Sequence, residues 1–79
     1  MKDTLTYIVS SIVDNTEAVV ISEETDETGT IQFFIHVAKE EVGKIIGKDG
    51  KVIRAIRNVM KIPAIKQNKR IRISISEEE

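Results

Sequence analysis

Apolar residues in the first part of the chain recur with the period of a helix. Five of them fall at positions i, i+3, i+4, i+7 and i+8: Leu5, Ile8, Val9, Ile12 and Val13. This spacing predicts an amphipathic helix with one apolar stripe. Asp3 is its expected N-cap, and Asp14-Asn15 is its expected stop.

Alternation of apolar and polar residues predicts strands elsewhere. Residues 18–22 and 30–37 are expected to form two strands joined by a polar turn at residues 23–29, and residues 69–76 to form a third. The second strand would turn four apolar side chains to one face: Ile31, Phe33, Ile35 and Val37. Phe34 falls on the other face and is expected to be partly exposed, and His36 beside it is expected to be an ordinary surface residue.

Helical spacing returns between the second and third strands. Residues 40–46 are expected to form a short helix, and a longer one follows with this apolar stripe: Val52, Ile53, Ile56, Val59 and Met60. The opposite arc of the longer helix is basic, with Lys51, Arg54, Arg57 and Lys61. Pro63 disfavours helix at Ile62 and lacks a backbone N–H, so the helix is expected to end or kink there.

The element order is therefore helix, strand, strand, helix, helix, strand. For a chain of 79 residues this predicts one small α+β domain over residues 1–79, with a frayed acidic tail at residues 76–79. A three-stranded sheet with the helices packed on one face would bury both the strand alternation and the helical stripes.

Composition narrows the possible functions. The chain has no cysteine, so disulfides and thiolate metal sites are excluded. Its apolar runs are only a few residues long, and no signal peptide is recognised, so a cytoplasmic location is expected. There is one histidine and no glycine-flanked serine, so neither an enzyme nor a cofactor is expected.

The formal net charge of −1 hides a strong asymmetry. Residues 1–37 carry one basic and seven acidic side chains, whereas residues 38–76 carry eleven basic and three acidic ones. The second part of the chain therefore has the charge expected of a nucleic-acid contact, although a solvated basic face would give the same count.

The most informative motif is the bend Gly47-Lys48-Asp49-Gly50 between the two expected helices. Two glycines three residues apart can fold a very tight turn, and their missing β-carbons let a ligand approach the main chain. The free N–H groups at the start of the next helix favour a phosphate. Lys44, Lys48 and Lys51 are expected to lie near the same bend.

A family resemblance extends this interpretation. The stretch from Val42 to Ile53, with G-x-x-G between two helices, resembles the signature of KH domains, which hold single-stranded nucleic acid. The element order resembles the type II form of this fold, found in small bacterial RNA-binding proteins with a single KH domain. The resemblance implies these RNA-binding residues: Val42, Gly43, Lys44, Ile45, Ile46, Gly47, Lys48, Asp49, Gly50, Lys51 and Arg54.

Several of these residues have a second interpretation. Core positions are favoured over ligand contact for Ile46, as for Ile53 and Ile56, whereas the two roles are evenly balanced for Val42 and Ile45. Gly43 would let either a base or a packed helix pass closely. Asp49 would repel a phosphate, and the favoured role for it is to cap the following helix. With few aromatic residues, base stacking is not expected.

A nucleotide-binding P-loop is excluded by spacing. The glycines at 43 and 47 are one residue too close, and Asp49 stands where that motif requires Ser or Thr for magnesium. The acidic cluster at residues 23–27 lacks the pattern of a calcium loop.

Two functions remain open. In the first, the domain binds single-stranded RNA. The family resemblance implies that it also associates with itself and with a second KH-containing RNA-binding protein. In the second, it is a dimerising adaptor with little or no nucleic-acid binding. Val59, Ile62 and Ile65 are the expected dimer contact, although they could equally complete the core.

Overall fold

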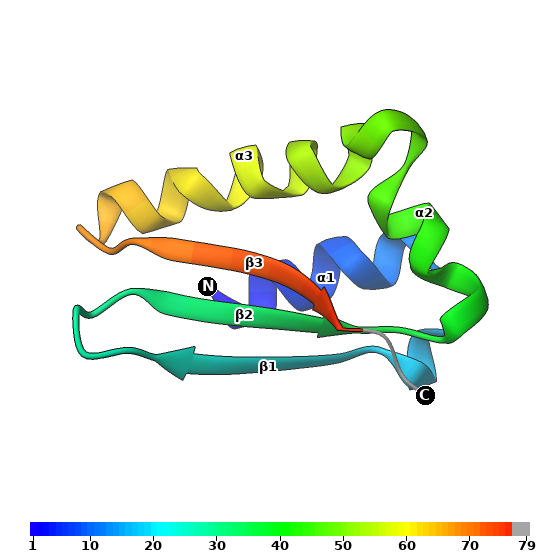
Figure 1. The fold of residues 1–79 in the computed structure, drawn as a ribbon, viewed down its shortest axis with the longest axis horizontal. Helices are drawn as coiled ribbons and strands as arrows, with labels where there is room; N and C mark the ends of the chain where they lie inside the picture. The colour runs from blue at the N-terminus through cyan, green and yellow to red at the C-terminus, as the bar shows by residue number, and fades with distance from the viewer. Residues whose placement is uncertain (77–79) are drawn as a thin grey trace.

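The described part of the chain folds into one sheet and three α-helices. A computed structural model describes residues 1–76. In chain order the regular elements are α1 (Lys2–Ile12), β1 (Val20–Thr25), β2 (Ile31–His36), α2 (Val42–Ile46), α3 (Lys51–Lys66) and β3 (Ile71–Ser76). Three short 3-10 turns lie between them, at Thr16–Ala18, Lys39–Glu41 and Lys48–Gly50. The α-β-β-α-α-β order expected from the sequence is confirmed (Figure 1).

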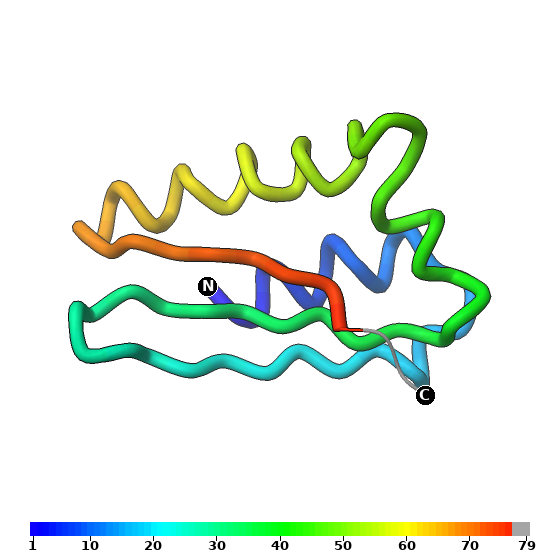
Figure 2. Tube along the Cα trace, viewed as in Figure 1, coloured from blue at the N-terminus to red at the C-terminus, as the bar shows by residue number. Residues whose placement is uncertain are grey.

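The sheet has the strand order β1-β2-β3, with β2 in the centre. β1 pairs with β2 in antiparallel register, with Val20 opposite His36 and Thr25 opposite Ile31. β2 pairs with β3 in parallel register, so the chain must cross from one end of the sheet to the other between them. α2 and α3 provide this crossover. All three helices lie on one face of the sheet (Figures 1 and 2).

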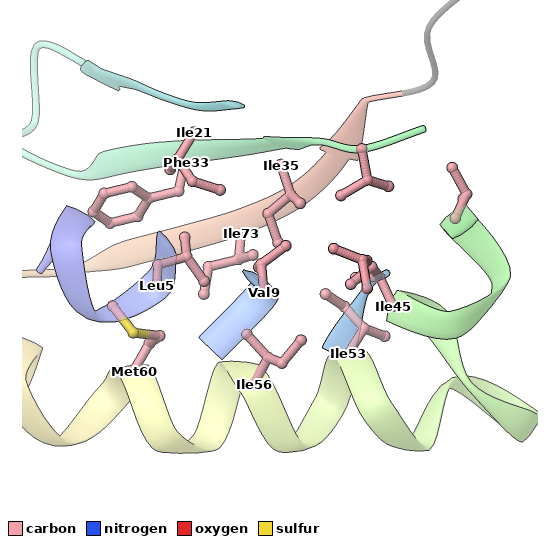
Figure 3. Packing of buried hydrophobic residues seen from close by; sticks show 13 residues of the cluster. Leu5, Val9, Ile21, Phe33, Ile35, Ile45, Ile53, Ile56, Met60 and Ile73 are labelled. Atoms are coloured by element: carbon pink, nitrogen blue, oxygen red, sulfur yellow. The ribbon is translucent and has the colours of Figure 1, made fainter. Parts of the chain in front are cut away.

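The core lies between that sheet face and the helices (Figure 3). It is aliphatic apart from Phe33 and Met60, as the composition requires. Seven large side chains are fully buried: Phe33, Leu5, Ile35, Ile45, Met60, Val9 and Val37. The predicted stripe of α1 and the inward face of β2 therefore meet, as their periods indicate.

Two local expectations are wrong. Asp3 lies inside α1, whose N-cap is Met1, and no side chain caps the helix. The first strand is displaced from residues 18–22 to Val20–Thr25. The reason is a tight turn in which the Asp26 carboxylate accepts from the backbone N–H groups of Thr28 and Thr30. Because the turn begins only at Asp26, the polar residues 23–25 belong to β1. β1 is an edge strand, and polar side chains are tolerated on its exposed side.

Of the two outcomes expected at Pro63, an end of α3 is wrong, because the helix continues to Lys66. A kink there stays a prediction. Proline leaves the carbonyl of Val59 without its usual helical donor. Val59 is 47% exposed, so water can replace that donor. Ala64 is buried, which holds the last turn of α3 against the core.

The sequence predicts that the end of the chain frays from residue 76. Ser76 is the last residue of β3, where it pairs with His36. Residues 77–79 lie outside the described residues. None of the described helices is long and apolar enough to cross a membrane.

A buried carboxylate fixes the start of α2, and the sequence pattern does not reveal it. Glu41 is 5% exposed. Its Oε1 accepts from the backbone N–H of Asp14 at 2.7 Å and from that of Asn15 at 3.2 Å. These amides follow the end of α1, so Glu41 joins the end of α1 to the beginning of α2. A buried carboxylate requires such donors to offset its desolvation.

Replacing Pro63 with Ala should stabilise the domain. The substitution restores a helical hydrogen bond to the Val59 carbonyl and should raise the free energy of unfolding by about 1–2 kcal/mol. Urea denaturation followed by circular dichroism measures this change. A decrease in stability would show that packing of the proline ring outweighs the hydrogen bond.

Removing the charge of Glu41 should destabilise the domain. Glu41→Gln keeps one acceptor but loses the charge-assisted bonds to Asp14 and Asn15, which predicts a loss of about 1–3 kcal/mol in the free energy of unfolding. Glu40→Gln is the matched control, because Glu40 is exposed. Equal unfolding curves for the two variants would contradict the role assigned to Glu41.

Candidate nucleic-acid interface

The bend at residues 47–50 is held in a shape that requires glycine. Gly47 has φ 73° and ψ 176°, and Gly50 has φ 74° and ψ 16°. A β-carbon on Gly47 would collide with the Val52 side chain and lie 2.9 Å from the Val52 backbone nitrogen. Gly47 therefore lets α2 and α3 approach at the bend, and Gly50 supplies the left-handed backbone from which α3 starts.

The bend has backbone N–H groups that make no hydrogen bond within the described residues. Gly47 N–H bonds to the Gly43 carbonyl at 2.8 Å, and Gly50 N–H bonds to the Gly47 carbonyl at 3.2 Å. The N–H groups of Lys48 and Asp49 have no acceptor among residues 1–76. Both residues are exposed, and the bend lies at an outer corner of the molecule (Figure 2). Two neighbouring backbone donors are thus available to an anion.

Three cations surround these donors. Lys48, Lys51 and Arg54 are all exposed. The Arg54 guanidinium turns back toward the bend, with Nη2 3.5 Å from the Asp49 carbonyl oxygen. These residues come from the bend itself and from the first turn of α3, so they form one basic surface around the free amides.

Lys44, expected near the bend, is paired with two carboxylates of the fold. Its Nζ lies 2.8 Å from Asp14 Oδ2 and 3.8 Å from Glu41 Oε1. The hydrogen bond to Asp14 raises the pKa of Lys44, and the same bond lowers the pKa of Asp14. Lys44 therefore reinforces the connection between α1 and α2, and its charge is balanced by two carboxylates.

Asp49 does not cap α3, so the favoured interpretation of this residue is wrong. The N-cap of α3 is Gly50, and no side chain caps the helix. Asp49 has φ 56° and ψ 25°, a left-handed conformation that Asp tolerates better than most residues. Its side chain is exposed within the bend. The carboxylate thus stands near the free amides and opposes part of the positive charge there.

The burial of the aliphatic residues near the bend differs in part from the burial that the sequence predicts. Ile45 has no exposed surface and Val42 is 8% exposed, so both side chains belong to the core beneath the bend. Ile53 and Ile56 are buried as expected. Ile46 is 39% exposed, so its expected core position is wrong, and it is the aliphatic side chain of α2 that a ligand can reach.

Gly43 faces open space. A β-carbon there would meet nothing within 4 Å, so no helix packs closely against it. Of the two interpretations left open by the sequence, close helix packing is therefore excluded. The surface beside Gly43 and Ile46 is available to a ligand.

A side chain on the basic arc of α3 connects this helix to the sheet. Arg57 lies beyond the first turn of α3, and its Nη2 donates to the Ile73 carbonyl of β3 at 3.3 Å. The basic side of α3 therefore reaches the edge of the sheet. Sequence spacing could not show this contact, because it depends on how the helix packs across the strand.

The apolar side chains near the end of α3 do not complete the core. Val59 is 47% exposed, Ile62 is 59% exposed and Ile65 is 75% exposed. The interpretation that they finish the core is wrong. Together they form an exposed apolar surface on a helix whose other face is already packed against the sheet.

The rest of the described chain offers no competing centre of chemistry. A shallow polar pocket lined by Thr28, Gly29, Asn68, Lys69 and Arg70 lies at the opposite end of the molecule from the bend (Figure 1). Within residues 1–76, no group of three or more His, Cys, Asp or Glu side chains is placed to hold a metal ion.

Comparison with known proteins agrees with this architecture. Residues 2–75 match the family described as KhpA/KhpB, KH domain. Similar proteins include the RNA-binding protein KhpA of Chlamydia pneumoniae, 44% identical with 99% of each chain covered. KhpA of Clostridium acetobutylicum is 44% identical over 95% of this chain and 99% of its own. KhpA of Listeria monocytogenes serovar 1/2a is 36% identical over 98% and 100%. The chain therefore belongs to the KhpA/KhpB family of KH-domain proteins.

Proposed function

We propose that this protein binds single-stranded RNA at the bend formed by residues 47–50. The observation that carries the proposal is the pair of unengaged amides at Lys48 and Asp49, exposed beside three cations. An RNA phosphate would accept from these amides while Lys48, Lys51 and Arg54 neutralise its charge. The similar proteins named above are RNA-binding proteins, which supports RNA as the ligand class.

Bases would lie on the surface beside the bend. Gly43 leaves open space there, and Ile46 supplies exposed aliphatic area. Val42 and Ile45 support this surface from the core, and Lys44 holds α2 in place. A KH groove accepts about four nucleotides. Because the exposed carboxylate of Asp49 opposes the phosphate, we expect modest affinity and loose base preference.

We also propose that the exposed surface of Val59, Ile62 and Ile65 is a contact between subunits. Exposed apolar side chains that cluster on one helix are typical of association surfaces. Two copies would present two small RNA grooves and so raise the avidity. The same surface could pair with a second KH-containing RNA-binding protein, which family resemblance suggests is KhpB, also called Jag. Through such complexes the protein would act in post-transcriptional regulation.

The alternative is a dimerising adaptor with little or no RNA binding. Asp49 favours this alternative, because it places a carboxylate in the bend that caps no helix. The acidic charge of residues 1–37 also favours the adaptor. The cytoplasmic location and the absence of enzymatic activity stay predictions for either function.

Lys48→Asp should weaken RNA binding strongly. The variant puts a second carboxylate in the bend, and we expect affinity for a short single-stranded RNA to fall at least about tenfold at low salt. The slope of log K against log salt should also become shallower by about 0.7, the value for one lost phosphate contact on a single strand. Fluorescence anisotropy of a labelled RNA measures both quantities.

Lys66→Asp is the matched control for this experiment. It makes the same change of charge at the far end of α3, a helix of 16 residues. At a rise of 1.5 Å per residue, the helix separates the two sites by about 24 Å. The affinity of this variant for the short RNA should stay close to that of the wild type. Equal losses in the two variants would indicate non-specific attraction, and an absence of wild-type binding would favour the adaptor.

Val59→Asp should shift the protein toward the monomer. A carboxylate on the apolar surface would have to be desolvated in the subunit contact, which costs more than the contact returns. Sedimentation velocity at several protein concentrations measures the change. Val20→Asp is the matched control, because Val20 on β1 is 54% exposed and undergoes the same chemical change. An unchanged oligomeric state for Val59→Asp would reject this surface as the contact.

A further inference from the structure

The face of the sheet opposite the helices has no helix of the described chain against it (Figure 1). Strand register arranges its side chains in rows. The central row runs Ser22, Phe34, Ser74 across β1, β2 and β3. An aromatic residue therefore stands between two serines in the middle of the uncovered face. The small serines leave the ring accessible, and Phe34 is partly exposed.

The Phe34 side chain lies outside the core cluster between the sheet and the helices. The neighbouring Phe33 points to the helices and is fully buried, so the inward side of β2 is already filled. On the outward side, Gln32 and His36 flank Phe34 along the same strand, each about 6.8 Å away by strand spacing. The Gln32 Nε2 donates to Ser74 Oγ at 3.1 Å and is thereby held beside the ring. Hydrogen-bonding groups thus lie on both sides of one aromatic side chain.

Charge on this face is divided between its two edges. β1 contributes Glu24, whereas the β3 side contributes Arg70 and Arg72, both exposed. Asp26, in the turn between β1 and β2, is a second carboxylate near this face. The hydrogen bond from the Thr28 side chain is the main reason that its pKa is lowered, and attraction to Arg72 contributes less. The part of the face over β2 and β3 is therefore complementary to an anionic polymer, and β1 would repel it.

We propose that this face is a second contact for single-stranded RNA, in which a base stacks on Phe34 and Arg72 meets a neighbouring phosphate. Sheet spacings put the α-carbons of Phe34 and Arg72 about 8 Å apart, a separation that one nucleotide spans. Stacking on aromatic side chains of an open sheet is an established way to hold single-stranded RNA. The inference rests on the proposed function for its ligand class, but it uses a different surface.

The two surfaces meet at β3. Arg57 of α3 bonds to the Ile73 carbonyl, so the basic side of α3 borders the strand whose other neighbour is β2. An RNA held at the bend could continue past Arg54 and Arg57 and cross β3 to reach Phe34. The open face would then lengthen the binding site beyond the four or so nucleotides of a KH groove.

Phe34→Trp tests this directly, because the natural chain has no tryptophan and the variant carries a single indole. Titration with a mixed-sequence single-stranded RNA of about ten nucleotides, longer than one KH groove holds, should quench the indole fluorescence. Phe34→Ser should weaken binding of the same RNA roughly five- to 150-fold, the loss that corresponds to about 1–3 kcal/mol for one stacked base. Binding of an RNA of about four nucleotides should change less than about twofold, because it occupies only the bend.

Tyr7→Trp is the matched control for quenching, since Tyr7 is 67% exposed on α1, away from this face. The fluorescence of this variant should not respond to the RNA. Phe34→Tyr should retain the affinity, which separates stacking from a loss of folding. If the longer RNA binds and Lys48→Asp weakens it while the Phe34→Trp variant stays unquenched, the open face is not an RNA contact and the bend remains one. If the RNA does not bind the wild type, both proposals fail.

Discussion

The close approach of Gly47 to Val52 is the contact on which the arrangement of the binding surface depends. Because Gly47 has no β-carbon, its backbone can lie directly against Val52. α2 can therefore end and α3 can begin within one short turn. α2 has only five residues, too few to be stable alone. It is held because Ile45 is buried in the core behind it and Ile53 is buried at the start of α3. A rigid core thus presents a bend whose own backbone is left open to solvent.

The basic side chains near the bend and α2 form two groups. One is paired with carboxylates of the fold, and the other is available to a ligand. Lys44 is balanced by Asp14 and Glu41, and this group joins the end of α1 to the start of α2. The cations around the bend, Lys48 among them, have no carboxylate partner within ion-pair distance in the described part of the chain. This is how a chain with a formal net charge of −1 can attract a polyanion locally. Charges beyond about 10 Å are screened at ordinary salt, so the acidic β1 side has little influence at the bend.

The sequence predicts the parts of this structure that depend on local periodicity. Alternation identifies β2 with its buried face, helical spacing identifies α1 and α3, and the paired glycines identify the bend. Some of the errors concern contacts between residues that lie far apart in the sequence. The partner of Lys44 is Asp14, 30 residues away, and Glu41 accepts from amides 26 and 27 residues away, so no local pattern reveals either. Asp49 fails as a cap because Gly50, one residue later, starts the helix.

Phosphate contact at the bend depends on two backbone amides that the fold leaves without acceptors. Amide chemical shifts of the ¹⁵N-labelled protein, recorded during titration with a short single-stranded RNA, test this most directly. We expect the N–H signals of Lys48 and Asp49 to move most, with those at the start of α3 next. If these signals stay in place while RNA binding shifts signals elsewhere, the assignment of the bend as the phosphate site is wrong.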